Sequence, residues 1–470
     1  MKFEEEDLLK KEKVRKSLKY SIMDGSFYSA MVGFGESFFS AFAVFLQANN
    51  FILGLLGSLP QTLGSLSQLL STRLMELFKS RKRMVCTFAL LQGMMYIPIA
   101  LLFFFGEMKA AYLVIFVCLY FIFGMILGPA WNSWMGDLVD KEERGAYFGR
   151  RNKITGFTSF ITFIIAGYLL QLFSGGTTIE YIGFFLLFGI AFASRVASFV
   201  YLTKKYEPKF EINHESRFSF IDFVKDSFSR SFNRFVLYLS LMNLSVYIAA
   251  PFFTVYMLKD LHFNYAAFTI ITATSILVKF LMMPVWGKIT DKHGTRKVLT
   301  VTGILMPFSP LLWLFSNDFL YLIMAQVYSG FVWAGFEMAS FNYIFDATTP
   351  QKRPTCVAYF NVLNGIMIFI GAMLGTLLVK YNNIFWSVYL LVFLVSFISR
   401  ITVSTLFLPF LKEFRRVENI SYKDLMLKVI SGMPTMGLIH DIITFKHNHN
   451  EKNATNNNTK RSGKNTKLKR

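Results

Sequence analysis

The sequence predicts an all-α membrane protein with about twelve spanning helices in two six-helix bundles. Of its 470 residues, 54% are apolar and only 17% are charged. The charges gather in short segments between apolar runs of roughly twenty residues, each long enough to cross a hydrocarbon core of about 30 Å as a helix. Basic residues are concentrated in alternate connecting segments, which is the topology pattern of a multi-pass protein.

The expected spans follow the apolar runs in chain order. Their order indicates six spans on each side of one long polar segment, residues 204–234. The spans are expected at residues 22–47, 51–75, 84–105, 110–136, 154–173, 180–203, 235–258, 265–287, 298–316, 319–345, 357–380 and 383–408.

The loops predict the orientation of the chain. Lys and Arg are frequent after the second, fourth and sixth spans, at 81–83, 141–151 and 204–234. The loops 47–50, 174–180 and 316–318 contain neither residue. Because basic loops stay on the cytoplasmic side, we expect both termini there, in the cytoplasmic membrane of a prokaryotic cell. The acidic, mixed-charge residues 1–20 do not resemble a cleavable signal and are expected to be cytoplasmic.

Several functional classes are disfavoured. The net charge of +20 lies in loops that flank apolar runs, so we expect no nucleic-acid partner. Cys86, Cys118 and Cys356 lack metal-ligand spacing. The chain contains neither a nucleotide-binding loop nor the context of a catalytic triad. We therefore expect neither an enzyme nor a resident cofactor.

The two halves of the chain look repeated. Asn132, Asp137 and Arg144 follow the fourth span, and Asn342, Asp346 and Arg353 follow the tenth. The interval from Asp to Arg is seven residues in both. This repeat predicts a first bundle at 21–203 and a second at 235–410, related by a pseudo-twofold axis.

A short polar loop joins the eighth and ninth spans, from Gly287 to Lys297. Gly287, Asp291, Gly294, Arg296 and Lys297 form the pattern G-x-x-x-D-x-x-G-x-R-K. We expect the first glycine to let a neighbouring helix approach and the second to supply a positive φ, with the basic pair at the anionic membrane surface. The first-half counterpart is weaker, with Glu76 in place of the aspartate, then Lys79, Arg81 and Lys82, and no glycines.

These loops resemble those of the major facilitator superfamily, and the resemblance covers roughly residues 20–410. It implies that helices one, four, seven and ten line a central cavity and that the two loops take part in switching between states. The mixed charges from Asp137 to Asn152, including Arg144, are expected to pair with Gly287 to Lys297 or with its first-half counterpart. The alternative is a solvated loop whose pairs contribute almost nothing.

Ionisable residues inside spans are functional candidates because burying a charge in the membrane is costly. Glu36 lies about 21 Å into the first helix, on a polar stripe. We expect it to line the cavity or carry a proton, the alternative being a structural hydrogen bond to an adjacent helix. Glu337 shares a face with Trp333 and either has a transport role or pairs with Lys279; the sequence does not separate these two readings.

Further candidates are weaker. Asn243 and Tyr247 share a face of the seventh span, and Trp131 and Asn132 follow Pro129 in the fourth. Arg195 and Arg400 occupy matching places in the sixth and twelfth spans, where snorkelling to the headgroups or repeat-symmetric packing is expected.

The predicted function is secondary transport of a small organic solute by alternating access, coupled to protons. The other hypothesis is a facilitator-like receptor, sensor or lipid translocator. Efflux of amphipathic compounds and uptake of a sugar-like solute both stay open, although the Gly-Pro pair of drug antiporters stands here in the fourth span, at Gly128 and Pro129. We expect a monomer in contact with lipid. The tail, 411–470, is expected to be cytoplasmic, with a surface helix within 420–444 and a disordered end.

Overall fold

The computed structural model describes residues 2–140, 143–208, 231–347, 353–382, 384–385, 387–414, 417–418 and 420–431. Helices are the only regular elements in this part of the chain. Eleven of them are long and apolar enough to span a membrane, which confirms a multi-pass all-α protein. They contain the apolar runs because those runs are also the segments that must satisfy their backbone polar groups internally.

The first bundle contains the elements up to residue 203. In chain order they are α1 (Lys2–Phe34), α2 (Phe39–Phe45), α3 (Asn50–Leu56), α4 (Leu59–Ser67), α5 (Ser71–Phe78), α6 (Arg81–Met94), α7 (Tyr96–Ala100), α8 (Lys109–Ile126), α9 (Gly128–Leu138), α10 (Arg144–Leu172) and α11 (Thr177–Thr203).

The second bundle and the segment after it follow residue 230. Their elements are α13 (Ser231–Ala249), α14 (Phe252–Val255), α15 (Tyr265–His293), α16 (Thr295–Leu305), α17 (Phe308–Leu311), α18 (Phe319–Ala347), α19 (Arg353–Tyr381), α20 (Val388–Phe407) and α21 (Tyr422–Ser431).

The second predicted span, 51–75, is the one not found among the eleven, and it is divided into α3, α4, a 3₁₀ turn and α5. Two of its glycines lie against the second bundle: a side chain at Gly57 would collide with Pro251, and Gly54 lies against Thr376. Glycine weakens a helix but lets another backbone come close. The segment therefore falls short of the length and apolarity of a spanning helix, and it serves as a contact between the bundles.

Some helices begin earlier in the chain than the sequence predicts. The helix predicted at 154–173 begins ten residues earlier, at Arg144, and α13 begins at Ser231 where 235 was expected. Most of the expected loop 204–234 and the tail beyond residue 431 lie outside the described residues. The predicted surface helix corresponds to α21, whose Leu425 and Val429 are fully buried against the second bundle.

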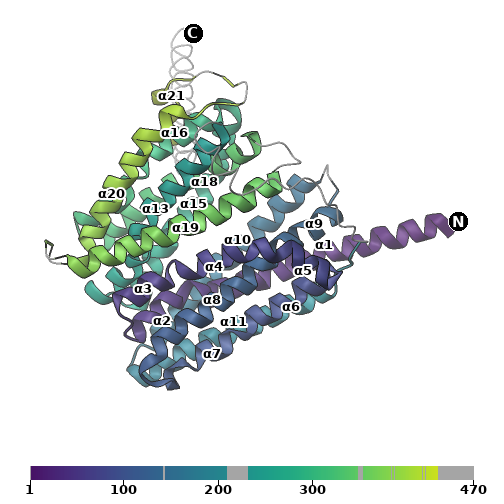
Figure 1. Ribbon diagram of the computed structural model, residues 1–470, viewed down its shortest axis with the longest axis horizontal. Helices are drawn as coiled ribbons and strands as arrows, with labels where there is room; N and C mark the ends of the chain where they lie inside the picture. Colours follow the sequence, from purple (N-terminus) through teal and green to yellow (C-terminus); the bar gives the residue numbers. More distant parts are fainter. Residues whose placement is uncertain are drawn as a thin grey trace, which may run out of the picture.

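The two bundles pack against each other through α3 and α4 with α19, and through α10 with α15. We call the end that carries residues 79–81, 204–208 and 293–295 the basic end, and the end that carries residues 46–50, 173–177 and 261–265 the opposite end. Figure 1 shows the bundles meeting near α2 and α3, whereas α5 and α6 of the first bundle lie far from α16 and α21 of the second.

The apolar core follows the same division. One large cluster takes residues from both bundles, including Phe38 and Phe184 of the first and Phe252 and Phe268 of the second. Toward the basic end each bundle has its own cluster: one surrounds Trp134 and the other surrounds Trp286. The bundles thus share a core at the opposite end and have separate cores at the basic end.

Hydrogen bonds between the bundles join the same regions. At the opposite end, Tyr265 Oη donates to Glu180 Oε1, and Tyr389 Oη donates to Asn50 Oδ1 at 2.8 Å. Further toward the basic end, Thr62 Oγ1 donates to the Gly365 carbonyl at 2.7 Å.

Candidate functional site

Glu36 lies where the first helix breaks. The helix α1 ends at Phe34, and residues Glu36–Phe38 form a 3₁₀ turn before α2. The break occurs at Gly35, where a side chain would collide with the hydroxyl of Tyr96. Tyr120 Oη of α8 donates to Glu36 Oε2 at 2.8 Å. The carboxyl group is therefore bound to an adjacent helix within the first bundle, a contact compatible with either role expected from the sequence.

Glu337 and Lys279 form an ion pair between α18 and α15, with Glu337 Oε1 and Lys279 Nζ 3.1 Å apart. Ile270, Leu277 and Leu281 form an exposed apolar stripe along α15, and Lys279 is about 200° around the helix from each of Leu277 and Leu281. The exposed Phe280 lies outside this stripe, against Gly156 of α10. The pair therefore lies away from that apolar stripe. Its side chains are 39% and 29% exposed.

The other candidates of the second bundle are only partly accessible. Asn243 Nδ2 donates to Asn364 Oδ1 of α19 at 2.8 Å, so its amide links two helices. Tyr247 and Trp333 are half-buried. The ring of Trp333 lies 6.1 Å from that of Phe336, centroid to centroid.

Trp131 packs against cations of its own bundle. The Arg151 guanidinium lies 4.5 Å from the Trp131 ring centroid, and Lys205 Nζ lies 5.7 Å from it. Lys205 also lies 5.1 Å from the ring of Trp134. Asn132, on the next position of α9, is exposed. The structure thus separates these two neighbours, since Trp131 covers a buried charge and Asn132 does not.

The buried charge belongs to an ion pair that the sequence analysis did not anticipate. Lys205 Nζ lies 2.5 Å from Asp24 Oδ2, and their side chains are 0% and 5% exposed. Burial lowers the pKa of Lys205, and Asp24 opposes this effect by favouring the protonated amine. The only available signal was an acidic residue near the start of the first span.

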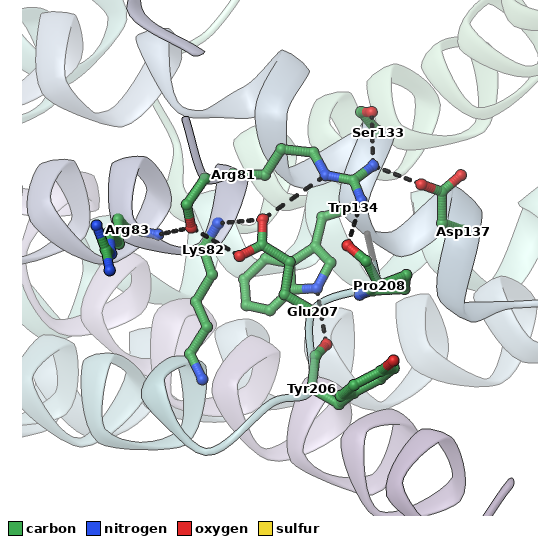
Figure 2. Close-up of polar contacts among 10 residues, drawn as sticks. Arg81, Lys82, Arg83, Ser133, Trp134, Asp137, Tyr206, Glu207 and Pro208 are labelled. Carbon is green, nitrogen blue, oxygen red and sulfur yellow. Dashed lines mark hydrogen bonds and ion pairs between the residues drawn. The ribbon is translucent and has the colours of Figure 1, made fainter. Parts of the chain in front are cut away.

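Arg81 is the centre of the first-half loop (Figure 2). Its side chain is 1% exposed, and its Nη1 donates to Asp137 Oδ2 at 2.6 Å and to Ser133 Oγ at 3.1 Å. On the other side, Arg81 Nε lies 3.9 Å from Glu207 Oε1. The carboxylate of Glu207 also accepts from the Lys82 backbone N–H at 3.1 Å and from Ser80 Oγ at 2.6 Å.

Asp137 thus pairs with the first-half counterpart, the second of the two partners expected from the sequence. Arg144 has a different role, because its guanidinium donates to the carbonyls of Gly136 and Val139, at the end of α9. It satisfies carbonyl groups that a helix terminus leaves without an intrahelical partner. Glu76, near the end of α5, is half-buried.

The loop from Gly287 to Lys297 is held by the segment after α20. Glu413 Oε2 accepts from the Arg296 backbone N–H at 2.9 Å, and Lys297 Nζ donates to the Ile420 carbonyl at 2.9 Å. Gly294 has φ +95°, as predicted, and a side chain there would collide with Glu413. Asp291 is exposed in the last turn of α15.

Gly287 was expected to let a neighbouring helix approach closely, and this prediction is wrong. A side chain at this glycine would make only an ordinary contact, 3.8 Å from Met338. The close approach of α15 and α18 occurs instead at Gly330, which leaves no room between itself and the Ser275 carbonyl, and at Gly335, which lies against Trp286.

The two loops correspond in their contacts. Lys79, with φ +50°, stands where Gly294 stands in the second half. Glu207 and Glu413 each accept from a backbone N–H at the start of the following helix, and Lys82 Nζ, like Lys297 Nζ, donates to a backbone carbonyl of the segment after the bundle. Neither glutamate was predicted from the sequence, although each follows the last span of its half.

Arg195 and Arg400 do not snorkel, because their side chains are only 3% and 2% exposed. Arg195 Nη1 donates to Ser198 Oγ at 3.1 Å, and Arg400 Nε donates to Ser396 Oγ at 3.0 Å. Each arginine bonds a serine of its own helix, but this serine follows Arg195 by three residues and precedes Arg400 by four, so the two contacts are not the same in the two halves.

Comparison with solved structures gives transporters of the same architecture. A mutant of the nucleoside transporter NupG matches with a TM-score of 0.65 and 13% identity over 84% of this chain and 100% of that chain. A D-xylose-proton symporter matches with a TM-score of 0.67 and 11% identity over 86% and 99%. A bacterial homologue of the iron transporter ferroportin, in an inward-facing state, matches with a TM-score of 0.59 and 13% identity over 85% and 98%.

No sequence among the curated proteins matches the chain. The profile of the Major Facilitator Superfamily matches residues 25–247 and again 235–440, so it covers both bundles. The resemblance noted in the two loops is thereby confirmed, and the chain belongs to the major facilitator superfamily.

Proposed function

We propose that the protein is a secondary transporter that moves a small organic solute by alternating access. The observation that supports this function best is the asymmetry of the core: the bundles share one apolar cluster at the opposite end and have separate clusters at the basic end. Two rigid bundles that are closed at one end and apart at the other represent one of the two states that alternating access requires.

The distribution of basic loops supports a cytoplasmic position for the basic end, in the cytoplasmic membrane. In that orientation the structure is an inward-open state. The hydrogen bonds of Tyr265 with Glu180 and of Tyr389 with Asn50 then close the outer side. Opening outward requires these bonds to break while the basic ends approach each other.

Glu36 is the proposed coupling group. It lies at the break of the first predicted span, half-buried, and accepts a hydrogen bond from the Tyr120 hydroxyl. A carboxyl group in this setting binds or releases a proton when its surroundings change between states. Lys279 and Glu337 are the proposed substrate contacts, because they are partly exposed and lie away from the apolar stripe of α15.

The substrate class is a small organic solute. The names of the similar structures, a nucleoside transporter and a D-xylose-proton symporter, suggest the compounds to test first. Fold likeness at this identity does not transfer a substrate.

The test uses proteoliposomes loaded with a pH-sensitive dye. Nucleosides, sugars, organic acids and amphipathic cations are added in turn to the parent protein and to Glu36→Gln. We expect one class to drive proton flux, and we expect that flux to be lost in Glu36→Gln but kept in the control Glu107→Gln, which removes an exposed carboxylate.

Two results argue against the proposal in different ways. Proton flux that survives Glu36→Gln would refute the role of that carboxylate while leaving transport in place. Paired spin labels on the two bundles at the opposite end report the distance between them. No solute-driven flux, with a label distance that no compound changes, would favour a protein that does not transport.

A further inference from the structure

A cavity of about 520 Å³ lies at the basic end of the first bundle, between the start of α6 and the end of α11. Three basic residues and one acidic residue line it, together with Ser80, Cys86 and Thr203. The charged residues are Lys79, Lys82, Arg83 and Glu207.

The single acidic residue does not neutralise the cavity. Both oxygens of Glu207 already accept, from Ser80 Oγ and from the Lys82 backbone N–H. Lys82 Nζ donates to the Lys205 carbonyl at 2.8 Å, a neutral partner. The nearby buried cations have carboxylates of their own, since Arg81 pairs with Asp137 and Lys205 pairs with Asp24.

Lys79 and Arg83 are both exposed at this cavity. Within the part of the chain that the structure describes, neither side chain has a hydrogen bond or an ion pair with a carboxylate. The cavity therefore has a net positive charge that the described residues do not neutralise.

The backbone of Lys79 strengthens this interpretation. Its φ of +50° is a left-handed conformation, which the Cβ atom of a non-glycine residue disfavours. The corresponding position of the second half is Gly294, the residue that best tolerates such a φ. The same turn is therefore made by a lysine in the first half and by a glycine in the second, and only the lysine adds a charged side chain to the loop.

The two halves also differ in what covers the loop. Around Gly294 the space is filled by Glu413 and Val417 of the segment after α20. Around Lys79 there is the cavity. Glu207 is the first-half counterpart of Glu413, but among the described residues it lines an open hollow with three basic residues, whereas Glu413 fills the space over Gly294.

We infer that this cavity binds a phosphate-bearing anion at the membrane surface, from either a lipid headgroup or a soluble phosphate ester. Lys and Arg side chains are the usual partners of phosphate oxygens. The position suits a lipid, because Met94 of α6 and Val200 of α11 are 44% and 40% exposed on the membrane-spanning part of these helices. Basic pockets beside helix ends on the cytoplasmic side are where anionic headgroups lie.

The experiment measures binding to the full-length protein in detergent. Phosphatidylglycerol is titrated against the parent protein, and phosphatidylcholine serves as the zwitterionic comparison. In a second arm, glycerol 3-phosphate and inorganic phosphate are titrated as soluble probes. Native mass spectrometry counts bound lipid, and the unfolding temperature reports stabilisation by either type of ligand.

The test variant is Lys79→Gln with Arg83→Gln, matched by a control that removes two exposed cations of the same end outside the cavity, Lys153→Gln with Lys204→Gln. Each cation near an anionic group contributes a factor of about five in affinity, so we expect about 30-fold weaker binding in the test variant. The control should bind within about twofold of the parent.

Preferential binding of phosphatidylglycerol that the test variant loses identifies a lipid headgroup, and loss confined to the soluble probes identifies a phosphate ester; both support the site. Equal loss in test and control variants would reduce the effect to general surface charge and overturn the proposal. Unchanged affinity in a folded test variant would also overturn it.

Discussion

The buried pair of Asp24 and Lys205 allows a sharp test of how the first bundle is held together at its basic end. The two side chains are 5% and 0% exposed, and no other carboxylate lies within ion-pair distance of Lys205 among the described residues. The perturbation is Asp24→Asn, which keeps the volume of the side chain and removes its charge.

The expected loss is large because the lysine stays buried without its counter-charge. Removing one partner of a buried ion pair typically costs about 3–5 kcal/mol. For a unit the size of one bundle this corresponds to a fall in the unfolding temperature on the order of 10 °C. An exposed pair is the control: Glu12 and Lys16 are 58% and 62% exposed, so Glu12→Gln should leave the unfolding temperature almost unchanged.

A double variant separates the charge from the packing. In Asp24→Leu with Lys205→Met, both charges are replaced by apolar groups, and the methionine fits against the rings of Trp131 and Trp134. Replacing a whole buried pair in this way is often neutral or stabilising. We expect the double variant to recover most of the unfolding temperature lost in Asp24→Asn.

The stability lost in Asp24→Asn should also depend on pH. Burial lowers the pKa of Lys205 below its usual 10.5, and in Asp24→Asn the opposing carboxylate is gone. Below the folded-state pKa the variant bears the full penalty of a buried charge. Between that pKa and the unfolded value the unfolded chain binds more protons, so stability rises with pH.

The assay is thermal unfolding in detergent, followed by intrinsic tryptophan fluorescence at pH 6, 7.5 and 9. An unfolding temperature of Asp24→Asn within about 1 °C of the parent would refute a costly buried charge, because it would mean that water reaches the pair. A double variant no more stable than Asp24→Asn would refute it as well.

Three further predictions concern the gate, the loop and the substrate contacts. Tyr265→Phe and Tyr389→Phe each remove one hydrogen bond between the bundles, which contributes about 1 kcal/mol to the closed state. Spin labels at the opposite end should therefore show a larger population of the separated state. No change in the distance distribution would exclude a closing role for these bonds. Lys79→Gly should raise the unfolding temperature by an amount equivalent to about 1 kcal/mol or less, because glycine adopts a φ of +50° without strain. A lower unfolding temperature would contradict the left-handed backbone at this residue. Glu337→Gln should change the free energy of unfolding by less than about 1 kcal/mol, because its pair with Lys279 is partly exposed. The same variant should lower solute uptake at least tenfold. Normal uptake would place the pair outside the transport path.

Much of the fold was accessible from the sequence because a membrane imposes a simple local rule. Apolar runs of sufficient length become helices, and the repeated interval from Asp137 to Arg144 and from Asp346 to Arg353 indicated two related halves. The positive φ of Gly294 followed from the same local logic. The rule failed for 51–75, where glycines serve contact with the second bundle at the expense of a continuous helix.

Side-chain partners were less accessible, even where the residue had been named. Glu36 was singled out, but its donor, Tyr120, lies on another helix. Arg81 was seen as part of a weak motif, but Glu207 stands more than a hundred residues away. Trp131 was named as a weak candidate, but the cations that lie over its ring, Arg151 and Lys205, come from other parts of the chain.

The sequence by itself therefore determined the order of the spanning helices, the division into two halves and the side of the membrane expected for each loop, because hydropathy and charge act within a stretch of about twenty residues. Only the tertiary structure decided which charges are paired and at which end the two bundles share a core. Those features depend on contacts between helices distant in the chain, and burial makes an ion pair such as Asp24 with Lys205 matter far more than its residue types alone suggest.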